Sequence, residues 1–211
     1  MQLENNYYYF KQAISKENCK KILSIGRSKP LNSATILSDK NKKIINKDKR
    51  DCKVIWINES WIYDLLNPFI NEANKAAGWN FDFDWNQDMQ YAKYDKGHYF
   101  GWHTDQSPKP FISENKNLNN KTRKISLTLQ LTDPSEYNGG DFEFKWFSGG
   151  KELIETTNDL KGLMARVDLG PRLTEEQMKQ QRENYFDLGR DEFLSLDQYL
   201  GSAQAFSDSE D

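Results

Sequence analysis

Alternation of apolar and polar positions predicts several β-strands. The clearest case is residues 125–131, Ile-Ser-Leu-Thr-Leu-Gln-Leu, where every second residue is apolar. This period is typical of a strand with one buried face. Further strands, rich in aromatic and β-branched residues, are predicted at residues 7–10, 52–57, 79–85, 89–94, 99–103 and 141–147.

Two segments have the spacing of amphipathic helices. Ser15 is placed to cap a helix to about Ile25, and Ser60 to cap a helix to Gly78 that is bent at Pro68. Two helices beside many short antiparallel strands predict a mainly β fold with flanking helices, a partly closed sandwich with the helices on one face.

The connecting segments are polar. Residues 26–50 are expected to form a long loop, and the basic stretch 40–50 within it a solvated one. Residues 106–123 are predicted to form a second polar loop.

Beyond Gly162 the sequence pattern becomes polar and helical. A T-x-x-Q capping box is expected to begin a helix at 174–185, and a second short helix is expected over 192–200. We therefore divide the chain into a domain at 1–162 and a divergent helical extension with an acidic tail at 163–211.

Composition narrows the function classes. The 211 residues are 13% aromatic, which is too high for a wholly disordered chain, and a net charge of −3 argues against a general nucleic-acid binder. No apolar run approaches the roughly 20 residues that span a bilayer, and no signal peptide precedes the first strand. Cys19 and Cys52 are predicted to be reduced thiols with structural roles. We expect a cytoplasmic protein that binds neither membrane nor nucleic acid; the oligomeric state is not predicted.

The candidate chemistry lies in the pair His103 and Asp105. Residues i and i+2 of an extended segment point to the same side, so this H-x-D pair presents an imidazole and a carboxylate to one ion. They form two thirds of the facial triad that holds Fe(II) in non-haem oxygenases. The chain has only one other histidine, His98, expected to be an exposed turn residue, and none after Asp105.

Residues 90–145 carry a longer pattern around this pair. It comprises Gln90-Tyr91, Tyr94-x-x-Gly97, the run from Phe100 to Asp105, and Tyr137-x-Gly-Gly-Asp-x-x-Phe144 after the alternating strand. Over roughly residues 5–162 the chain thereby resembles the Fe(II)/2-oxoglutarate-dependent dioxygenase superfamily, in particular its prolyl 4-hydroxylase-like, PKHD-type hydroxylases.

The resemblance implies a double-stranded β-helix (jelly roll), Fe(II), 2-oxoglutarate as cosubstrate, ascorbate as reductant, and hydroxylation of a C–H bond in a peptidyl or free amino-acid side chain. It assigns His103 and Asp105 to the metal and Tyr94 to 2-oxoglutarate. Tyr91 and Tyr94 are an odd number of residues apart, so we expect one in the core and one facing the site.

The chain departs from this family after Gly162. Family members carry a distal histidine there, followed by a basic residue that binds the far carboxylate of 2-oxoglutarate. Residues 163–172 have no histidine, although Arg166 and Arg172 stand near the basic position, and we assign Arg166 to 2-oxoglutarate. Whether the last strands of the jelly roll are present is left open.

Three explanations fit this departure. In the first, the C-terminal third is a foreign segment joined to an interrupted oxygenase domain. In the second, the metal site is altered, with Asp168, Glu175 or water as the third ligand. In the third, the chain is a catalytically inactive jelly-roll binding module. A cupin-like metal enzyme without 2-oxoglutarate is a further alternative. Iron binding and 2-oxoglutarate turnover distinguish these alternatives.

Overall fold

The computed structural model describes residues 7–37, 43–106, 110–148, 151–156, 163–167 and 191–201. Its helices are α1 (Lys16–Arg27) and α2 (Ser60–Ala76), and a 3₁₀ turn, η1, covers Pro134–Glu136. The strands are antiparallel and form one large sheet and three two-stranded ones.

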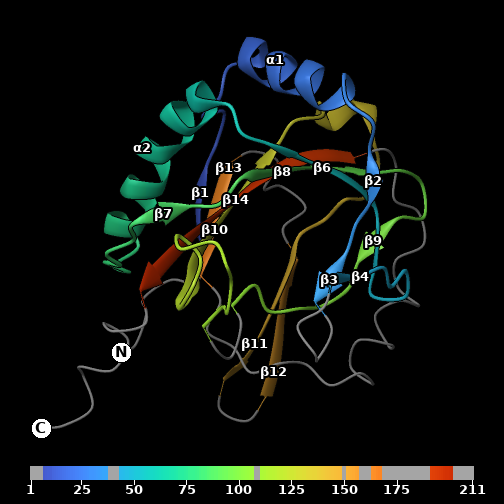
Figure 1. Cartoon of the computed structure of the whole chain (residues 1–211). Helices are drawn as coiled ribbons and strands as arrows, with labels where there is room; N and C mark the ends of the chain where they lie inside the picture. The colour runs from blue at the N-terminus through green and yellow to red at the C-terminus, as the bar shows by residue number, and fades with distance from the viewer. Residues whose placement is uncertain are drawn as a thin grey trace, which may run out of the picture.

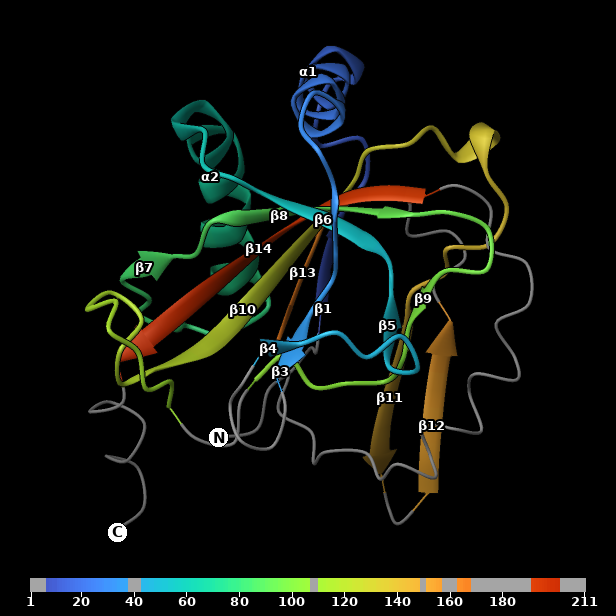
Figure 2. The same cartoon turned by 45° about the vertical axis from the view of Figure 1, so that its right-hand side comes forward.

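The large sheet has eight strands. In spatial order they are β1 (Tyr7–Phe10), β13 (Leu163–Val167), β10 (Lys121–Gln130), β14 (Asp191–Gly201), β8 (Met89–Tyr94), β6 (Lys53–Ile57) and β2 (Asn32–Ser33), with β7 (Trp85–Asn86) beside β14. The small sheets pair β3 (Ile36–Leu37) with β4 (Lys43–Ile44), β5 (Arg50–Asp51) with β9 (Tyr99–Phe100), and β11 (Glu143–Ser148) with β12 (Lys151–Thr156). Both helices lie on one side of the large sheet, and β5, β9, β11 and β12 lie on the other (Figures 1 and 2).

The helix-facing side of the large sheet is apolar. Alternate residues of β6, β8 and β10 point to this side and pack against α1 and α2 in one buried cluster. The sheet contributes Ile55, Ile57, Met89, Tyr91, Ile125, Leu127 and Leu129, and the helices contribute Ile22, Ile62, Leu66, Ile70 and Ala73. This cluster is the hydrophobic core of the described part of the chain.

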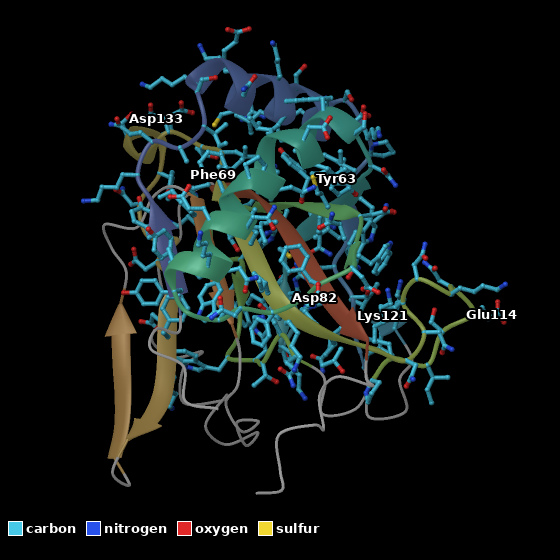
Figure 3. The ribbon with its side chains drawn as sticks, turned by 90° about the vertical axis from the view of Figure 1, so that its left-hand side faces the viewer. Tyr63, Phe69, Asp82, Glu114, Lys121 and Asp133 are labelled. Atoms are coloured by element: carbon cyan, nitrogen blue, oxygen red, sulfur yellow. The ribbon has the colours of Figure 1, made fainter. Side chains whose placement is uncertain are left out.

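Aromatic contacts fix α2 on the sheet. Phe69 meets Phe10 of β1 edge to face, with ring centroids 5.1 Å apart, and the Tyr63 hydroxyl donates to the carbonyl of Gln87 at 3.3 Å (Figure 3). Tyr91 of β8 contacts α1 so closely that a Cβ at Gly26 would overlap its ring. Glycine at position 26 is therefore required by packing.

The opposite side of the sheet carries both apolar and polar side chains. A second cluster there contains Ala34, Cys52, Val54, Ala92 and Tyr94, with Phe100 packed against it. The same side of β10 carries Ser126 and Thr128, which are only 2% and 3% exposed. Tyr91 and Tyr94 lie on opposite sides of the sheet, as their odd spacing predicts, and both are buried.

Several predicted elements are confirmed and some are wrong. The strands at 7–10 and 89–94 and the Ser15 cap of α1 are as expected, with the Ser15 side chain accepting from the Asn18 amide. The N-cap of α2 is Glu59 rather than Ser60, and residues 79–84 are irregular, leaving only β7 of that predicted strand. The loop expected at 26–50 contains β2, β3, β4 and β5, because these short strands pair with partners distant in sequence or across a turn.

The helix predicted over 192–200 is wrong. Residues 191–201 form β14, hydrogen-bonded to β10 on one side and β8 on the other. β13 and β14 thus stand in the same sheet as strands that precede residue 162, while the boundary at 162 stays a prediction. The helix expected at 174–185 lies outside the described residues.

Two further expectations concern the two cysteines and the possibility of a membrane-spanning helix. Cys19 and Cys52 are both free thiols. In the part of the chain that the structure describes, neither helix has the length and apolar character needed to cross a membrane.

Gly26→Ala is predicted to destabilise the fold. The new methyl group must displace the buried Tyr91 ring, and overpacking of this kind costs about 1–3 kcal/mol. Urea denaturation should show a lower midpoint at unchanged slope. Ser24→Ala, on the exposed side of the same helix, is the matched control and should leave the midpoint nearly unchanged; equal effects of the two substitutions would contradict the packing argument.

Candidate functional site

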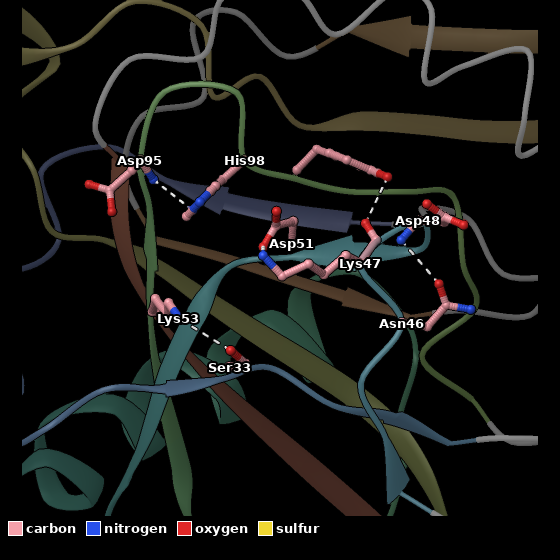
Figure 4. Close-up of polar contacts among 9 residues, drawn as sticks. Ser33, Asn46, Lys47, Asp48, Asp51, Lys53, Asp95 and His98 are labelled. Atoms are coloured by element: carbon pink, nitrogen blue, oxygen red, sulfur yellow. Dashed lines mark hydrogen bonds and ion pairs between the residues drawn. The ribbon is translucent and has the colours of Figure 1, made fainter.

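The segment that carries His103 and Asp105 leaves β9 and is tied to a distant turn. The Gly101 amide donates to the carbonyl of Lys49 at 2.9 Å, which extends the β5–β9 pairing. The preceding turn has Gly97 at φ +78° and is closed by the His98 amide, which donates to the Asp95 carbonyl at 2.9 Å. The Asp95 amide in turn donates to Nδ1 of His98 at 3.1 Å (Figure 4). His98 is half-buried rather than exposed, and it serves this turn.

His103 and Asp105 come together as predicted. Nε2 of His103 lies 3.2 Å from Oδ1 of Asp105, and Nδ1 lies 2.8 Å from the carbonyl oxygen of Gly101. The imidazole stacks on Phe100, with ring centroids 3.7 Å apart and an interplanar angle of 15°. The backbone carbonyl and the Phe100 ring thus fix both the rotation and the plane of the imidazole.

This geometry fits two protein ligands of one metal ion. Bonds of about 2.0–2.2 Å at right angles, as in octahedral coordination of first-row metals, place neighbouring donors about 3 Å apart. The Gly101 carbonyl can accept Nδ1–H, which leaves the lone pair of Nε2 for a metal; histidine ligands are commonly oriented this way. Arg123 approaches the same carboxylate oxygen of Asp105, with Nη1 3.7 Å from Oδ1, and balances its charge.

A third protein ligand is not found in the described ranges, where no three His, Cys, Asp or Glu side chains gather at a possible metal position. Asp168 and Glu175, which the sequence analysis considered for this role, lie outside those ranges. The two donors His103 and Asp105 therefore fit Fe(II) as far as the described structure reaches.

Tyr94 lies on the side of the sheet away from the helices, in the buried cluster that also holds Cys52 and against which Phe100 packs. Burial raises the pKa of its phenol well above the usual range, Cys52 adds to this shift, and Arg50 opposes it. The phenol therefore keeps its proton at neutral pH. A protonated phenol can donate a hydrogen bond, and the assignment of Tyr94 to 2-oxoglutarate stays a prediction.

Arg50 is a part of this region that sequence reasoning missed. It was counted within a solvated basic stretch, yet it is only 8% exposed. Its guanidinium donates from Nε to Sγ of Cys52 at 3.2 Å and from Nη2 to Oε1 of Gln90, and Cζ lies 4.4 Å from the Phe100 ring centroid. Its position directly before the apolar strand 52–57, rather than within the lysine run, is the sequence signal that could have identified Arg50 as buried.

The turn that carries Arg50 is itself well ordered by hydrogen bonds. The Asp48 amide donates to Oδ1 of Asn46 at 3.0 Å, and the Tyr99 hydroxyl donates to the Lys47 carbonyl at 2.9 Å (Figure 4). Lys47 pairs with Asp51 at 3.6 Å. The turn is thereby attached to β9 and through it to the H-x-D segment.

Arg166 is placed in β13, opposite Ser126 of β10 and opposite Tyr7 of β1. Oγ of Ser126 is buried and has no hydrogen-bond partner among the described residues. β13 and β8 are separated by β10 and β14, so Arg166 and Tyr94 are not brought together by strand pairing.

Comparisons with known proteins bear on the fold. No protein-family model matches the sequence, and no curated protein matches it. Among solved structures, the chain is similar to a prolyl hydroxylase from Trichoplax adhaerens in complex with a hypoxia inducible factor peptide fragment (TM-score 0.58, 12% identity, 98% of this chain and 88% of that one).

It is also similar to a Pseudomonas putida prolyl-4-hydroxylase (TM-score 0.55, 12% identity, 93% and 92% of the two chains) and to the viral collagen prolyl hydroxylase of Paramecium Bursaria Chlorella virus-1 (TM-score 0.52, 13% identity, 93% and 90%). At these identities the likeness shows the fold alone. The chain has a prolyl-hydroxylase-like fold, and its closure as a jelly roll stays a prediction.

Metal binding is predicted to depend on His103 and not on His98. In anaerobic calorimetric titrations with Fe(II), His103→Ala and Asp105→Ala should each weaken binding by more than about 100-fold, since loss of supporting groups alone already costs 10–100-fold. His98→Ala removes the other histidine of the chain and should bind Fe(II) like the unmodified protein. Equal losses in the two histidine variants would refute the assignment.

Proposed function

We propose that this protein is an Fe(II)- and 2-oxoglutarate-dependent hydroxylase of the prolyl 4-hydroxylase-like, PKHD type. The observation that carries the proposal is the 3.2 Å approach of His103 Nε2 to Asp105 Oδ1, with Nδ1 directed at the Gly101 carbonyl. It is supported by the prolyl-hydroxylase-like fold and by the buried cluster with Tyr94, against which Phe100, the stacking partner of His103, packs.

The roles of the residues follow from their positions. His103 and Asp105 would hold the metal, and Arg123 keeps a positive charge near the Asp105 carboxylate. The Tyr94 hydroxyl would donate a hydrogen bond to 2-oxoglutarate, and Arg166 is the second residue proposed to bind that ligand. When bound, Fe(II) supplies the redox chemistry that couples decarboxylation of 2-oxoglutarate to insertion of oxygen into a C–H bond.

The surroundings of His103 favour a rigid site. Phe100 covers one face of the imidazole, so the ring cannot turn without losing both the stack and the Gly101 contact. Preorganised ligands of this kind lower the cost of metal binding, because they lose little freedom when the ion enters.

The substrate class rests on the solved neighbours. The Trichoplax adhaerens enzyme is seen with a peptide fragment, and all three neighbours named above are prolyl hydroxylases. We propose an amino-acid side chain, peptidyl or free, as substrate, with ascorbate as reductant and the cytoplasm as location. The separate origin of residues 163–211 is part of the same proposal.

One observation favours a second candidate function. Within the described ranges a third metal ligand is missing, which fits a catalytically inactive binding module on the same fold. The two candidates differ in turnover: a hydroxylase consumes 2-oxoglutarate, whereas the binding module does not.

Turnover of 2-oxoglutarate is the predicted activity. The protein with Fe(II), ascorbate and oxygen should form succinate, followed by proton NMR, and His103→Ala and Asp105→Ala should abolish it. Tyr94→Phe should raise the 2-oxoglutarate concentration needed for half-maximal turnover by about 10- to 150-fold, the effect of one hydrogen bond to a charged group. Phe69→Leu, on the helix side of the sheet, is the control for general damage. Tight Fe(II) binding without succinate would favour the binding module.

A further inference from the structure

The turn at residues 43–49 exposes two isoleucines. Ile44 and Ile45 are 40% and 60% exposed, although isoleucine is among the residue types most often buried. Among the described residues only two other large hydrophobic side chains, Trp56 and Ile112, are comparably exposed, and they stand apart in the sequence. The 43–49 turn is therefore the one place in the described ranges where exposed isoleucines are neighbours in the chain.

This exposure belongs to a turn whose backbone is held in place. The amides of Lys49 and Arg50 both donate to the Asn46 carbonyl, at 3.1 and 3.0 Å. The Tyr99 hydroxyl donates to the Lys47 carbonyl at 2.9 Å, which attaches the turn to β9 (Figure 4). Apolar side chains presented to solvent on an ordered backbone are typical of an interaction surface.

The same region carries an excess of positive charge. Residues 43–53 and 93–98, which the β5–β9 and β6–β8 pairings bring together, contain seven basic and three acidic side chains, whereas the whole chain has a net charge of −3. The register even places Lys53 directly opposite Lys93, which is unfavourable between like charges. The basic residues are Lys43, Lys47, Lys49, Arg50, Lys53, Lys93 and Lys96, and the acidic ones are Asp48, Asp51 and Asp95.

Ion pairs within the region use only part of this charge. Lys47 lies 3.6 Å from Asp51, and Lys93 lies 2.9 Å from Asp95. The Lys47 side chain is 65% exposed, and ion pairs as exposed as this one are weak. Lys47 can therefore exchange Asp51 for a carboxylate of a partner, and Lys43 in β4 is exposed as well.

The 43–49 turn lies beside the candidate metal ligands. The Lys49 carbonyl accepts from the Gly101 amide at 2.9 Å, and Gly101 stands two residues before His103. An extended chain covers about 3.3 Å per residue. A polypeptide with one side chain at the metal therefore needs only a few more residues to reach the turn.

We propose that the 43–49 turn is a docking surface for an acidic stretch of a polypeptide substrate, with apolar side chains among its acids. This inference rests on the proposed function and narrows its substrate class to a peptidyl side chain close to acidic residues. Complementary charge gives such a contact its selectivity and a fast association rate. The isoleucines favour a peptide over a nucleic acid, because single-stranded nucleic acids are held by cations together with aromatic stacking, which aliphatic side chains do not offer.

Peptide binding tests the proposal without iron or 2-oxoglutarate. The probe is a fluorescein-labelled peptide with glutamates and leucines beside one proline, and the comparison peptide has glutamine for each glutamate. Fluorescence anisotropy with the full chain should show tighter binding of the glutamate peptide, weakened by added salt. Lys43→Gln combined with Lys47→Gln should weaken it about 2- to 30-fold, the range for two surface ion pairs, and leave the glutamine peptide unchanged.

Lys20→Gln combined with Lys21→Gln is the matched control. It removes two exposed lysines from α1, which lies across the large sheet from β5 and β9 (Figure 2). Lys21 pairs with Glu17 four residues away, as Lys47 pairs with Asp51. This variant should bind the glutamate peptide like the unmodified protein, and equal weakening in the two double variants would reveal a mere effect of net charge and overturn the inference.

Charge reversal gives a second, independent readout. Lys43→Glu combined with Lys47→Glu should favour a peptide with lysines over the glutamate peptide. The inference is overturned if the unmodified protein does not distinguish glutamate from glutamine, or if it binds an oligonucleotide of equal charge more tightly than the glutamate peptide.

The acidic end of the chain is the rival occupant. Binding of the glutamate peptide that appears only after Asp208, Glu210 and Asp211 are changed to their amides would assign the surface to that segment and also overturn the inference. None of these outcomes touches Fe(II) binding or succinate formation, so failure of the docking surface leaves the proposed function standing. Absence of succinate with intact peptide binding overturns the proposed function instead.

Discussion

The pairing of β5 with β9 is the contact on which the candidate site depends. It joins a turn from the first quarter of the chain to the segment that carries the H-x-D pair, through the Arg50–Phe100 register and the hydrogen bond from the Gly101 amide to the Lys49 carbonyl. Gly101 then accepts from His103 through its own carbonyl. One short ladder thus determines the position of Phe100, His103 and Arg50 together.

The large sheet determines which side chains surround the β5–β9 ladder. Because side chains alternate along a strand, β6, β8 and β10 present one set of apolar residues to the helices and a second set to the other side, which is apolar on β6 and β8 and polar on β10. Tyr91 and Tyr94 lie on opposite sides for this reason alone. The buried hydroxyl of Ser126, without a partner in the described structure, lies on this second side. Polar groups are rarely buried without a partner, so the Ser126 position on β10 is one at which a bound group would supply a missing hydrogen bond.

Local pattern was enough to predict what is determined locally. The strand at 89–94, the cap at Ser15 and the convergence of His103 with Asp105 follow from periods of two or four residues. The short strand containing Arg50 could not be predicted, because its formation depends on a partner about fifty residues away. The helix predicted over residues 192–200 was wrong for the same reason. These residues form β14, because hydrogen bonds to β8 and β10 outweigh the helical spacing of their apolar side chains.

Charge balance connects the two halves of the proposed site. Asp105 is shared between His103 and Arg123, and Arg123 is 21% exposed, so water compensates much of its charge. Among the described residues Arg50 forms no ion pair, and its buried charge meets only Cys52, Gln90 and the Phe100 ring. A divalent metal beside the single carboxylate of Asp105 would leave an excess positive charge, and on the proposed function the carboxylates of 2-oxoglutarate would supply the negative charge that balances it. In a medium of low dielectric constant such interactions are strong, so metal and cosubstrate would stabilise each other's binding.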